Sequence, residues 1–279
     1  MVLMINGLTL ALGEGEERLP ARVAALLNLP EGDLDEVRIV RRSIDARRAR
    51  PPRFVYRIRV RLRDGAPPPA AQSEADLTVT PLEDFQDQEQ EGPSGPCRKP
   101  ALRPVVIGCG PAGLFAALTL ALRGIPVLLL ERGKAVSERL SDVCAFWEKG
   151  TLNPESHVHF GEGGAGTFSD GKLTSRSKNP LTGWVKRVLV DMGAPGDILV
   201  DVRPHIGTDR LREVVVRLRS RLVEMGCEVR FGARATDLIV DQGRLAGVVV
   251  NGSEQVRADR LILAAGQSEA ALARSDASL

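Results

Sequence analysis

The residues Gly-Cys-Gly-Pro-Ala-Gly at 108–113 could hold a phosphate group. In such a turn Gly108 permits the tight bend and Gly110 lets a pyrophosphate approach the backbone. Gly113 lets the following helix pack against the preceding strand. Glu131 ends the next apolar run, 23 residues after Gly108, where a carboxylate can accept hydrogen bonds from both hydroxyls of an adenosine ribose. The spacing therefore predicts a dinucleotide site, with an acid that disfavours a 2′-phosphate.

Further residues extend this pattern. Pro111 and Ala112 lie inside the turn, and Arg132 follows Glu131. Later in the chain come CEVRFGARATDLIV at 227–240 and ADRLILAAG at 258–266. Together these segments resemble the two-dinucleotide-binding flavoprotein superfamily. The resemblance implies a strand pair that packs beside the adenine, near Ala235, and a strand that leads into a second glycine turn at Gly266.

Three other segments narrow the match. They are RIVRRSIDARR at 38–48, NPESHVHFGEGGAGTFSDGKL at 153–173 and RPHIGTDRLR at 203–212. These segments resemble a family of bacterial FAD-dependent dehydrogenases of undefined substrate, over residues 1 to about 266. The resemblance implies FAD binding and hydride transfer through flavin N5, with NAD(P)H as a candidate electron donor and an unknown small-molecule substrate. Since the superfamily has a further domain and a returning strand after the region of Gly266, a chain that stops at Leu279 is expected to be truncated.

Backbone and side-chain groups of the glycine-rich segment are candidate cofactor contacts. Its N–H groups suit a ribityl chain, a pyrophosphate or a flavin edge. Lys172 could place positive charge near the flavin N1–C2=O region, although a solvated surface lysine is the favoured interpretation. The candidate cofactor-binding residues are Gly108, Gly110, Pro111, Ala112, Gly113, Glu131, Arg132, Gly163, Gly164, Ala165, Gly166, Thr167, Lys172, Ala235 and Gly266.

No residue type identifies a catalytic acid, base or metal site. His157 and His159 flank a valine and would share one face of a strand, and a catalytic role is not favoured for them, for His205 or for Asp170. Cys109 is expected to be a small buried residue inside the turn. The cysteines, Cys97, Cys109, Cys144 and Cys227, have no paired spacing, which argues against zinc and disulfides and favours a reducing cytoplasm.

Arginine is concentrated in the N-terminal part of the chain. Residues 38–63 contain eleven arginines and one acid, Asp45. In the run from Tyr56 to Arg63 arginines alternate with apolar residues, which puts their guanidinium groups on one face of a strand. That face could bind RNA, another polyanion or an acidic partner, but a solvated face is favoured because Tyr56 points the other way and supplies no stacking platform.

The order of expected elements predicts an α/β protein. Residues 1–82 read as a small α+β domain, 83–103 as a linker, 104–266 as a Rossmann-like FAD- or NAD(P)-binding domain and 267–279 as a tail. Within the larger domain we expect strands at 105–107, 127–130, 227–231 and 260–264, helices at 111–123, 137–148, 181–192 and 208–225, and a hairpin at 235–250. The 137–148 helix is expected to bury Leu140, Val143, Cys144 and Trp147.

Composition is that of a globular protein, with 43% hydrophobic and 27% charged residues and a net charge of +2. No apolar run is long enough to cross a bilayer, and the N-terminus lacks the pattern of a signal peptide, so no membrane association is expected. Two alternatives to a flavoenzyme stay open. One is an NAD-dependent enzyme of the same fold, and the other is a nucleotide-stabilised protein that binds RNA or another polyanion through the arginine-rich domain.

Overall fold

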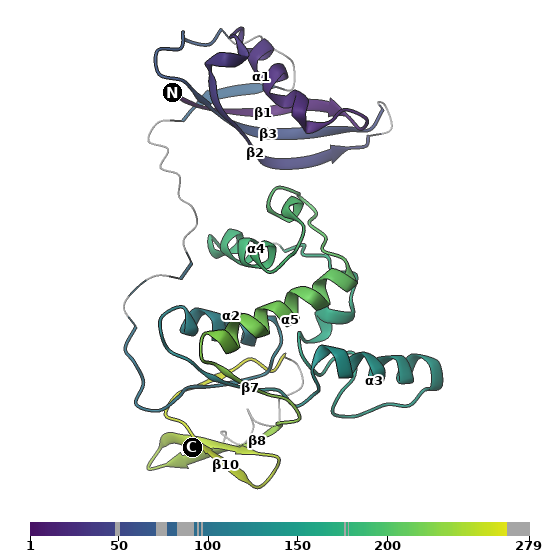
Figure 1. Ribbon diagram of the computed structural model, residues 1–279, viewed down its shortest axis with the longest axis vertical. Helices are drawn as coiled ribbons and strands as arrows, with labels where there is room; N and C mark the ends of the chain where they lie inside the picture. The colour runs from purple at the N-terminus through teal and green to yellow at the C-terminus, as the bar shows by residue number, and fades with distance from the viewer. Residues whose placement is uncertain are drawn as a thin grey trace. The chain divides into compact units, whose positions relative to one another are not determined.

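The computed structural model describes residues 1–47, 51–70, 77–82, 92–93, 95, 97–175, 177 and 179–266. The chain forms two compact units (Figure 1). Unit 1 comprises Met1–Gln90, Leu173–Lys178 and Pro195–Pro204, and unit 2 comprises Glu91–Lys172, Asn179–Ala194 and His205–Leu279. Residues 83–91, 94 and 96 of the predicted linker and the whole predicted tail lie outside the described residues. The predicted domain boundaries therefore stay a prediction.

Unit 1 contains an antiparallel sheet with strand order β2-β3-β1-β4. Helix α1 covers one face of this sheet (Figure 1) and its Val23 and Leu27 pack in a core with Ile5, Ile58 and Val60. Asn28 ends the helix in a left-handed conformation, with φ of 56°. The elements are β1 (Val2–Ala11), η1 (Glu16–Arg18), α1 (Leu19–Leu27), η2 (Glu31–Asp33), β2 (Leu34–Asp45), β3 (Arg53–Leu62) and β4 (Thr78–Pro81).

The alternation predicted for the third strand is confirmed. Tyr56 and Ile58 are buried in the core, whereas Arg57 and Arg61 are exposed on the opposite face. The expectation of a wholly solvated arginine face is wrong at Arg59, which is 4% exposed and donates to the Glu36 carboxylate. A neighbouring acid on β2 thus neutralises the centre of that face.

Unit 1 also includes a segment from the second half of the chain, which the sequence did not predict. Residues 195–204, with η4 (Gly196–Leu199), lie against β2, where Arg42 N donates to Val200 O. The Arg42 guanidinium forms ion pairs with Glu16, Asp197 and Asp201 at 2.7–3.1 Å. These charged contacts, together with the backbone bonds, hold the segment to the edge strand.

Unit 2 has three layers. A parallel sheet of order β11-β5-β6-β7 forms the middle. Helices α2 and α5 pack on one face, and an antiparallel sheet of order β10-β9-β8 packs on the other (Figure 1). The elements are β5 (Val105–Ile107), α2 (Pro111–Ala121), β6 (Leu128–Leu130), α3 (Val136–Lys149), η3 (Ala165–Phe168), α4 (Leu181–Asp191), α5 (Thr208–Glu224), β7 (Glu228–Arg230), β8 (Ala235–Asp241), β9 (Arg244–Val250), β10 (Glu254–Arg257) and β11 (Leu261–Leu263). This arrangement confirms the predicted α/β class.

The central strands are short and entirely apolar because both of their faces are covered. Val106 and Leu129 face the helices, and Ile107 and Leu130 face the antiparallel sheet. In contrast, β10 was not predicted, since three of its four residues are polar and exposed and its one apolar residue, Val256, makes no alternating pattern. The three-layer packing leaves the carboxyl ends of β5, β6 and β11 at one edge of the parallel sheet.

The predicted buried face of α3 is confirmed at Val143 and wrong at Trp147, which is 61% exposed. Leu140 and Cys144 are half-buried. Val136 and Arg139 are buried although they were not predicted to be. The helix therefore turns an arginine toward the interior, and an apolar pattern could not indicate that.

Candidate functional site

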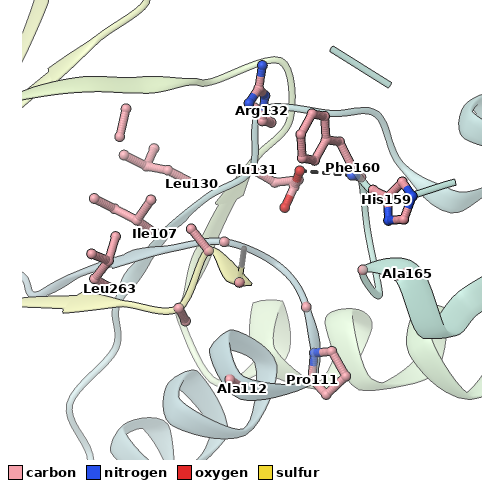
Figure 2. A pocket seen from close by; sticks show the side chains of 18 of the residues that line it. Ile107, Pro111, Ala112, Leu130, Glu131, Arg132, His159, Phe160, Ala165 and Leu263 are labelled. Carbon is pink, nitrogen blue, oxygen red and sulfur yellow. Dashed lines mark hydrogen bonds between the residues drawn. The ribbon is translucent and has the colours of Figure 1, made fainter. Parts of the chain in front are cut away.

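A cleft of about 1210 Å³ lies at the carboxyl ends of the parallel strands. In open α/β sheets this is where ligands bind. Figure 2 shows Ile107, Leu130 and Leu263 at one end of the cleft, with Glu131 and His159 toward the other. The lining residues are Ile107, Gly108, Gly110, Pro111, Ala112, Leu130, Glu131, Arg132, His157, His159, Phe160, Gly161, Gly164, Ala165, Ala233, Ala235, Leu263, Ala264, Ala265 and Gly266.

Ten of the fifteen candidate cofactor-binding residues line this one cleft. They come from segments far apart in the sequence, which the fold brings together. The ten are Gly108, Gly110, Pro111, Ala112, Glu131, Arg132, Gly164, Ala165, Ala235 and Gly266. Their shared location supports the candidate site, while the contact that each would make with a ligand stays a prediction.

The five remaining candidates lie outside the lining. Gly113 has the predicted packing role, since a Cβ there would collide with the carbonyl oxygen of Gly108. Thr167 is buried, and its hydroxyl donates to Glu162 O at 3.1 Å. Lys172 is paired with Asp170 and its side chain is 70% exposed, as the favoured surface interpretation expects.

The two glycine-rich segments face each other. A Cβ on Gly164 would lie 3.3 Å from the Cα of Gly110, so side chains at these positions would narrow the cleft between the segments. The N–H groups of Gly163 and Gly164 donate to the carbonyl oxygens of Cys109 and Gly161, because positive φ angles fold this loop back on itself. These two N–H groups are therefore not exposed as the sequence suggested. Gly166 follows Ala165 in η3.

Glu131 is 6% exposed and its carboxylate accepts three backbone hydrogen bonds. Oε2 accepts from Cys109 N at 2.8 Å, and Oε1 accepts from Gly133 N at 2.9 Å and Gly161 N at 3.0 Å. A carboxylate offers about four lone-pair directions. The side chain is thus held in a fixed orientation at the cleft, with acceptor capacity left for a ligand hydroxyl.

An aromatic and cationic wall borders the cleft beside Glu131. The Arg132 guanidinium lies 4.1 Å from the Phe160 ring centroid and is paired with Glu155 at 2.8 Å. The rings of His157 and Phe160 are 4.4 Å apart. Sequence reasoning missed Phe160 and considered the histidines only as proton donors. The two rings are tilted by 50° to each other, and an aromatic wall of this kind can contact a planar ligand ring.

The predicted strand around His157 and His159 is wrong. Residues 154–162 form turns and bends, because Gly161 has a φ of 120° and the loop carbonyls turn inward to a buried side chain. Burial lowers the pKa of His157, and the positive charges of His159, Arg139 and Arg132 lower it further. His157 therefore favours its neutral form near pH 7.

Two buried charged residues lie behind the loop that borders the cleft, and sequence reasoning also missed them. Arg139 and Glu162 both have a fractional exposure of 0%. Glu162 accepts from Val136 N at 2.8 Å and pairs with Arg219 at 2.9 Å, while burial raises its pKa. Only tertiary contacts reveal such residues, because single charged residues in a sequence ordinarily indicate solvent exposure.

Cys109 is fully buried, as predicted, and burial raises the pKa of its thiol. Within the described ranges, no group of three or more His, Cys, Asp or Glu side chains is arranged to hold a metal ion. None of the helices in the described part of the chain combines the length and the apolar character needed to cross a membrane.

Comparison with known families agrees with the cleft. The family described as "FAD binding domain" matches residues 103–163 and 186–278. The chain belongs to this FAD-binding domain family. FAD is therefore confirmed as the cofactor, and the glycine cradle of Gly110 and Gly164, the fixed Glu131 carboxylate and the size of the cleft all fit an elongated dinucleotide. A second family, a domain of unknown function (DUF8436), matches residues 2–61.

Individual relatives cover the chain to different extents. An uncharacterized protein of Clostridium beijerinckii is 36% identical over 268 residues, which is 96% of this chain and 49% of the relative. Digeranylgeranylglycerophospholipid reductase 1 of Methanopyrus kandleri is 29% identical over 61% of this chain and 41% of the relative. The crystal structure of Thermovibrio ammonificans THI4 aligns with a TM-score of 0.42 and 17% identity over 63% of this chain and 62% of that one. The chain thus spans half or less of the length of these two curated relatives.

Proposed function

We propose that this chain is the FAD-binding part of a flavin-dependent oxidoreductase whose substrate is a small molecule. The observation that carries the proposal is the meeting, in one cleft, of a glycine turn at a helix start, a fixed carboxylate at the end of the next strand and a second glycine loop. When bound, FAD supplies hydride chemistry at N5, with NAD(P)H as the proposed electron donor.

The cleft residues divide the work of binding. The Gly108–Gly113 turn and the start of α2 meet the pyrophosphate, where helix N–H groups and the helix dipole favour negative charge. Glu131 accepts a hydrogen bond from a ribose hydroxyl, and Arg132 with Ala235 borders the adenine. Toward the flavin, Ala165 and Gly166 offer backbone groups at the start of η3, Gly266 closes the far side, and Thr167 fixes the loop from below.

The relatives of this chain include a reductase, which agrees with the proposed class of enzyme but does not indicate a substrate for this chain. We place the protein in the cytoplasm, since its cysteines in the described residues are free thiols, two of them buried. The turn and Glu131 would also suit NAD, but the match to an FAD-binding family favours FAD over the NAD-dependent alternative of the sequence analysis.

The visible absorption spectrum of the purified chain tests the proposal. We expect a flavin spectrum after purification or after incubation with FAD and removal of excess cofactor. Titration with NAD in parallel provides the comparison. Tight NAD binding without retention of FAD would refute the flavoenzyme assignment and support the NAD-dependent alternative.

A pair of glycine variants separates loss of the turn from loss of folding. Gly113→Ala places a methyl group against the carbonyl oxygen of Gly108, while Gly124→Ala changes a glycine in the same unit that has open space around it but a φ of 71°. Retention of FAD should be lost in the first variant and kept in the folded fraction of the second. Equal loss in both would show that the effect is one of folding.

A further inference from the structure

Arg139 is the largest fully buried side chain among the described residues. Its guanidinium donates to three carbonyl oxygens of one loop: Nε to His157 O at 2.9 Å, Nη2 to Val158 O at 2.7 Å and Nη1 to Glu162 O at 2.6 Å. Burial lowers the pKa of Arg139 to about 10, so the side chain is still charged at pH 7. Burying a charge costs free energy unless its donors are well used, and here they are directed at a single loop.

The loop that Arg139 holds, residues 157–162, carries two features of the cleft. His157 and Phe160 belong to its aromatic wall, and Gly161 N donates to Glu131 Oε1 at 3.0 Å. The carbonyls gripped by Arg139 lie on both sides of Gly161 in the chain. A Cβ on Gly161 would collide with Cδ of Arg139, so the two residues fit together only because one is glycine.

Arg139 itself is absent from the cleft lining and cannot touch the cofactor. Of the three donors to Glu131, Cys109 and Gly133 belong to the turn and to the end of β6, whereas Gly161 comes from the loop. One of the three bonds that orient the carboxylate therefore comes from the loop, and the guanidinium holds the loop on both sides of that donor.

We propose that Arg139 is a positioning residue for the adenosine half of FAD, acting through the 157–162 loop on Glu131 and on the aromatic wall. The inference rests on the proposed binding of FAD in this cleft. It predicts that the planar fork of Arg139 matters, because its three bonds leave from three separate nitrogens, whereas the three donors of a lysine all leave from one nitrogen.

FAD titration of four proteins tests this role: the wild type, Arg139→Met, Arg139→Lys and Arg42→Met. Arg42 is the control, because it is an arginine of unit 1 with three acidic partners and 17% exposure. We expect the dissociation constant for FAD to rise about tenfold or more in both Arg139 variants, as loss of one charge-assisted hydrogen bond would produce. Arg42→Met should lower the melting temperature yet leave FAD affinity within about twofold of wild type.

The Lys variant separates positioning from electrostatics and from stability. If Arg139→Lys restores wild-type affinity, the charge alone matters and the proposal is wrong. Unchanged affinity in folded Arg139→Met would also overturn it. If Arg139→Met does not fold, hydrogen exchange of the 157–162 amides is measured in Arg139→Lys. The proposal expects these amides to exchange faster in that variant than in the wild type, and an unchanged exchange rate would overturn it. Failure of the wild type itself to bind FAD would instead refute the proposed function.

Discussion

Replacing Glu131 tests the candidate site most directly, because its carboxylate has a role in the fold as well as a proposed role in binding. Glu131→Ala leaves the N–H groups of Cys109, Gly133 and Gly161 without their acceptor. Each unsatisfied buried donor costs about 1–3 kcal/mol. Three donors give a loss of about 3–6 kcal/mol if water reaches some of them, which is a large part of the stability of an ordinary domain.

Glu131→Gln is the matched variant. Its single carbonyl oxygen can stay on the donors from Gly133 and Gly161, and its NH₂ group then meets the N–H of Cys109. One donor instead of three loses its acceptor, so the expected loss of stability is about 1–3 kcal/mol. Urea unfolding of the apo-proteins should therefore order the variants as wild type, then Gln, then Ala.

FAD affinity should follow a related order for a separate reason. Charge-assisted hydrogen bonds to the ribose contribute about 1.5–3 kcal/mol, so Glu131→Ala should weaken FAD binding by about 10- to 150-fold. In Glu131→Gln the carbonyl oxygen is already used by Gly133 and Gly161, so the ribose meets only the NH₂ group, which can donate to a hydroxyl oxygen. This variant should therefore weaken FAD binding less than Glu131→Ala does. Titration of folded apo-protein, followed by flavin fluorescence, measures this. An unchanged dissociation constant in both variants would refute the ribose assignment, even if stability falls as expected.

The remaining predictions concern other parts of the molecule. Gly113→Ala should abolish FAD retention, because its methyl group would displace Gly108; spectra of the gel-filtered protein check this. The pKa of His157 is lowered from its ordinary 6.5, so the unfolded chain binds more protons between the native pKa and 6.5, and stability should fall as pH drops through that window. His157→Gln should lose less stability there, as urea midpoints at about pH 7 and pH 5 would show. The full chain should not bind oligouridylate, since Tyr56 is buried on the face opposite Arg57, and salt-sensitive binding that Arg57→Gln weakens would contradict this.

The sequence allowed the parallel sheet to be predicted because burial on both faces leaves an unambiguous signal. Val105–Ile107 and Leu128–Leu130 are unbroken apolar runs, and the glycine turn between strand and helix fixed their connection. The same logic failed for β10, in which only Val256 contacts the core and the strand is defined by its backbone pairing with β9. A local sequence pattern predicts a strand or helix only when burial of its own side chains determines that element.

Most of the candidate site was predictable from the types and spacing of its own residues, whereas the 157–162 loop that supports it was not. Glycines at 108–113 and the acid at 131 act through their own backbone or position, so their types and spacing are informative. The loop at 157–162 takes its shape from Arg139 on α3 and from Glu131 at the end of β6. Neither partner is near in sequence, and a lone arginine in an amphipathic helix gives no indication of what it grips.

The three donors to Glu131 link local folding to binding. Because Cys109 N, Gly133 N and Gly161 N already orient the carboxylate, a ribose hydroxyl meets an acceptor whose ordering cost has been met by folding. The same linkage implies that bound FAD stabilises the turn, the strand end and the loop together, by an amount that grows with the logarithm of the FAD concentration. A variant that loosens any one of these donors should thus lower FAD affinity by disturbing the carboxylate. Gly161 is the donor that lies outside the predicted 108–113 motif, so a change there tests the effect of the carboxylate separately from the effect of the glycine turn.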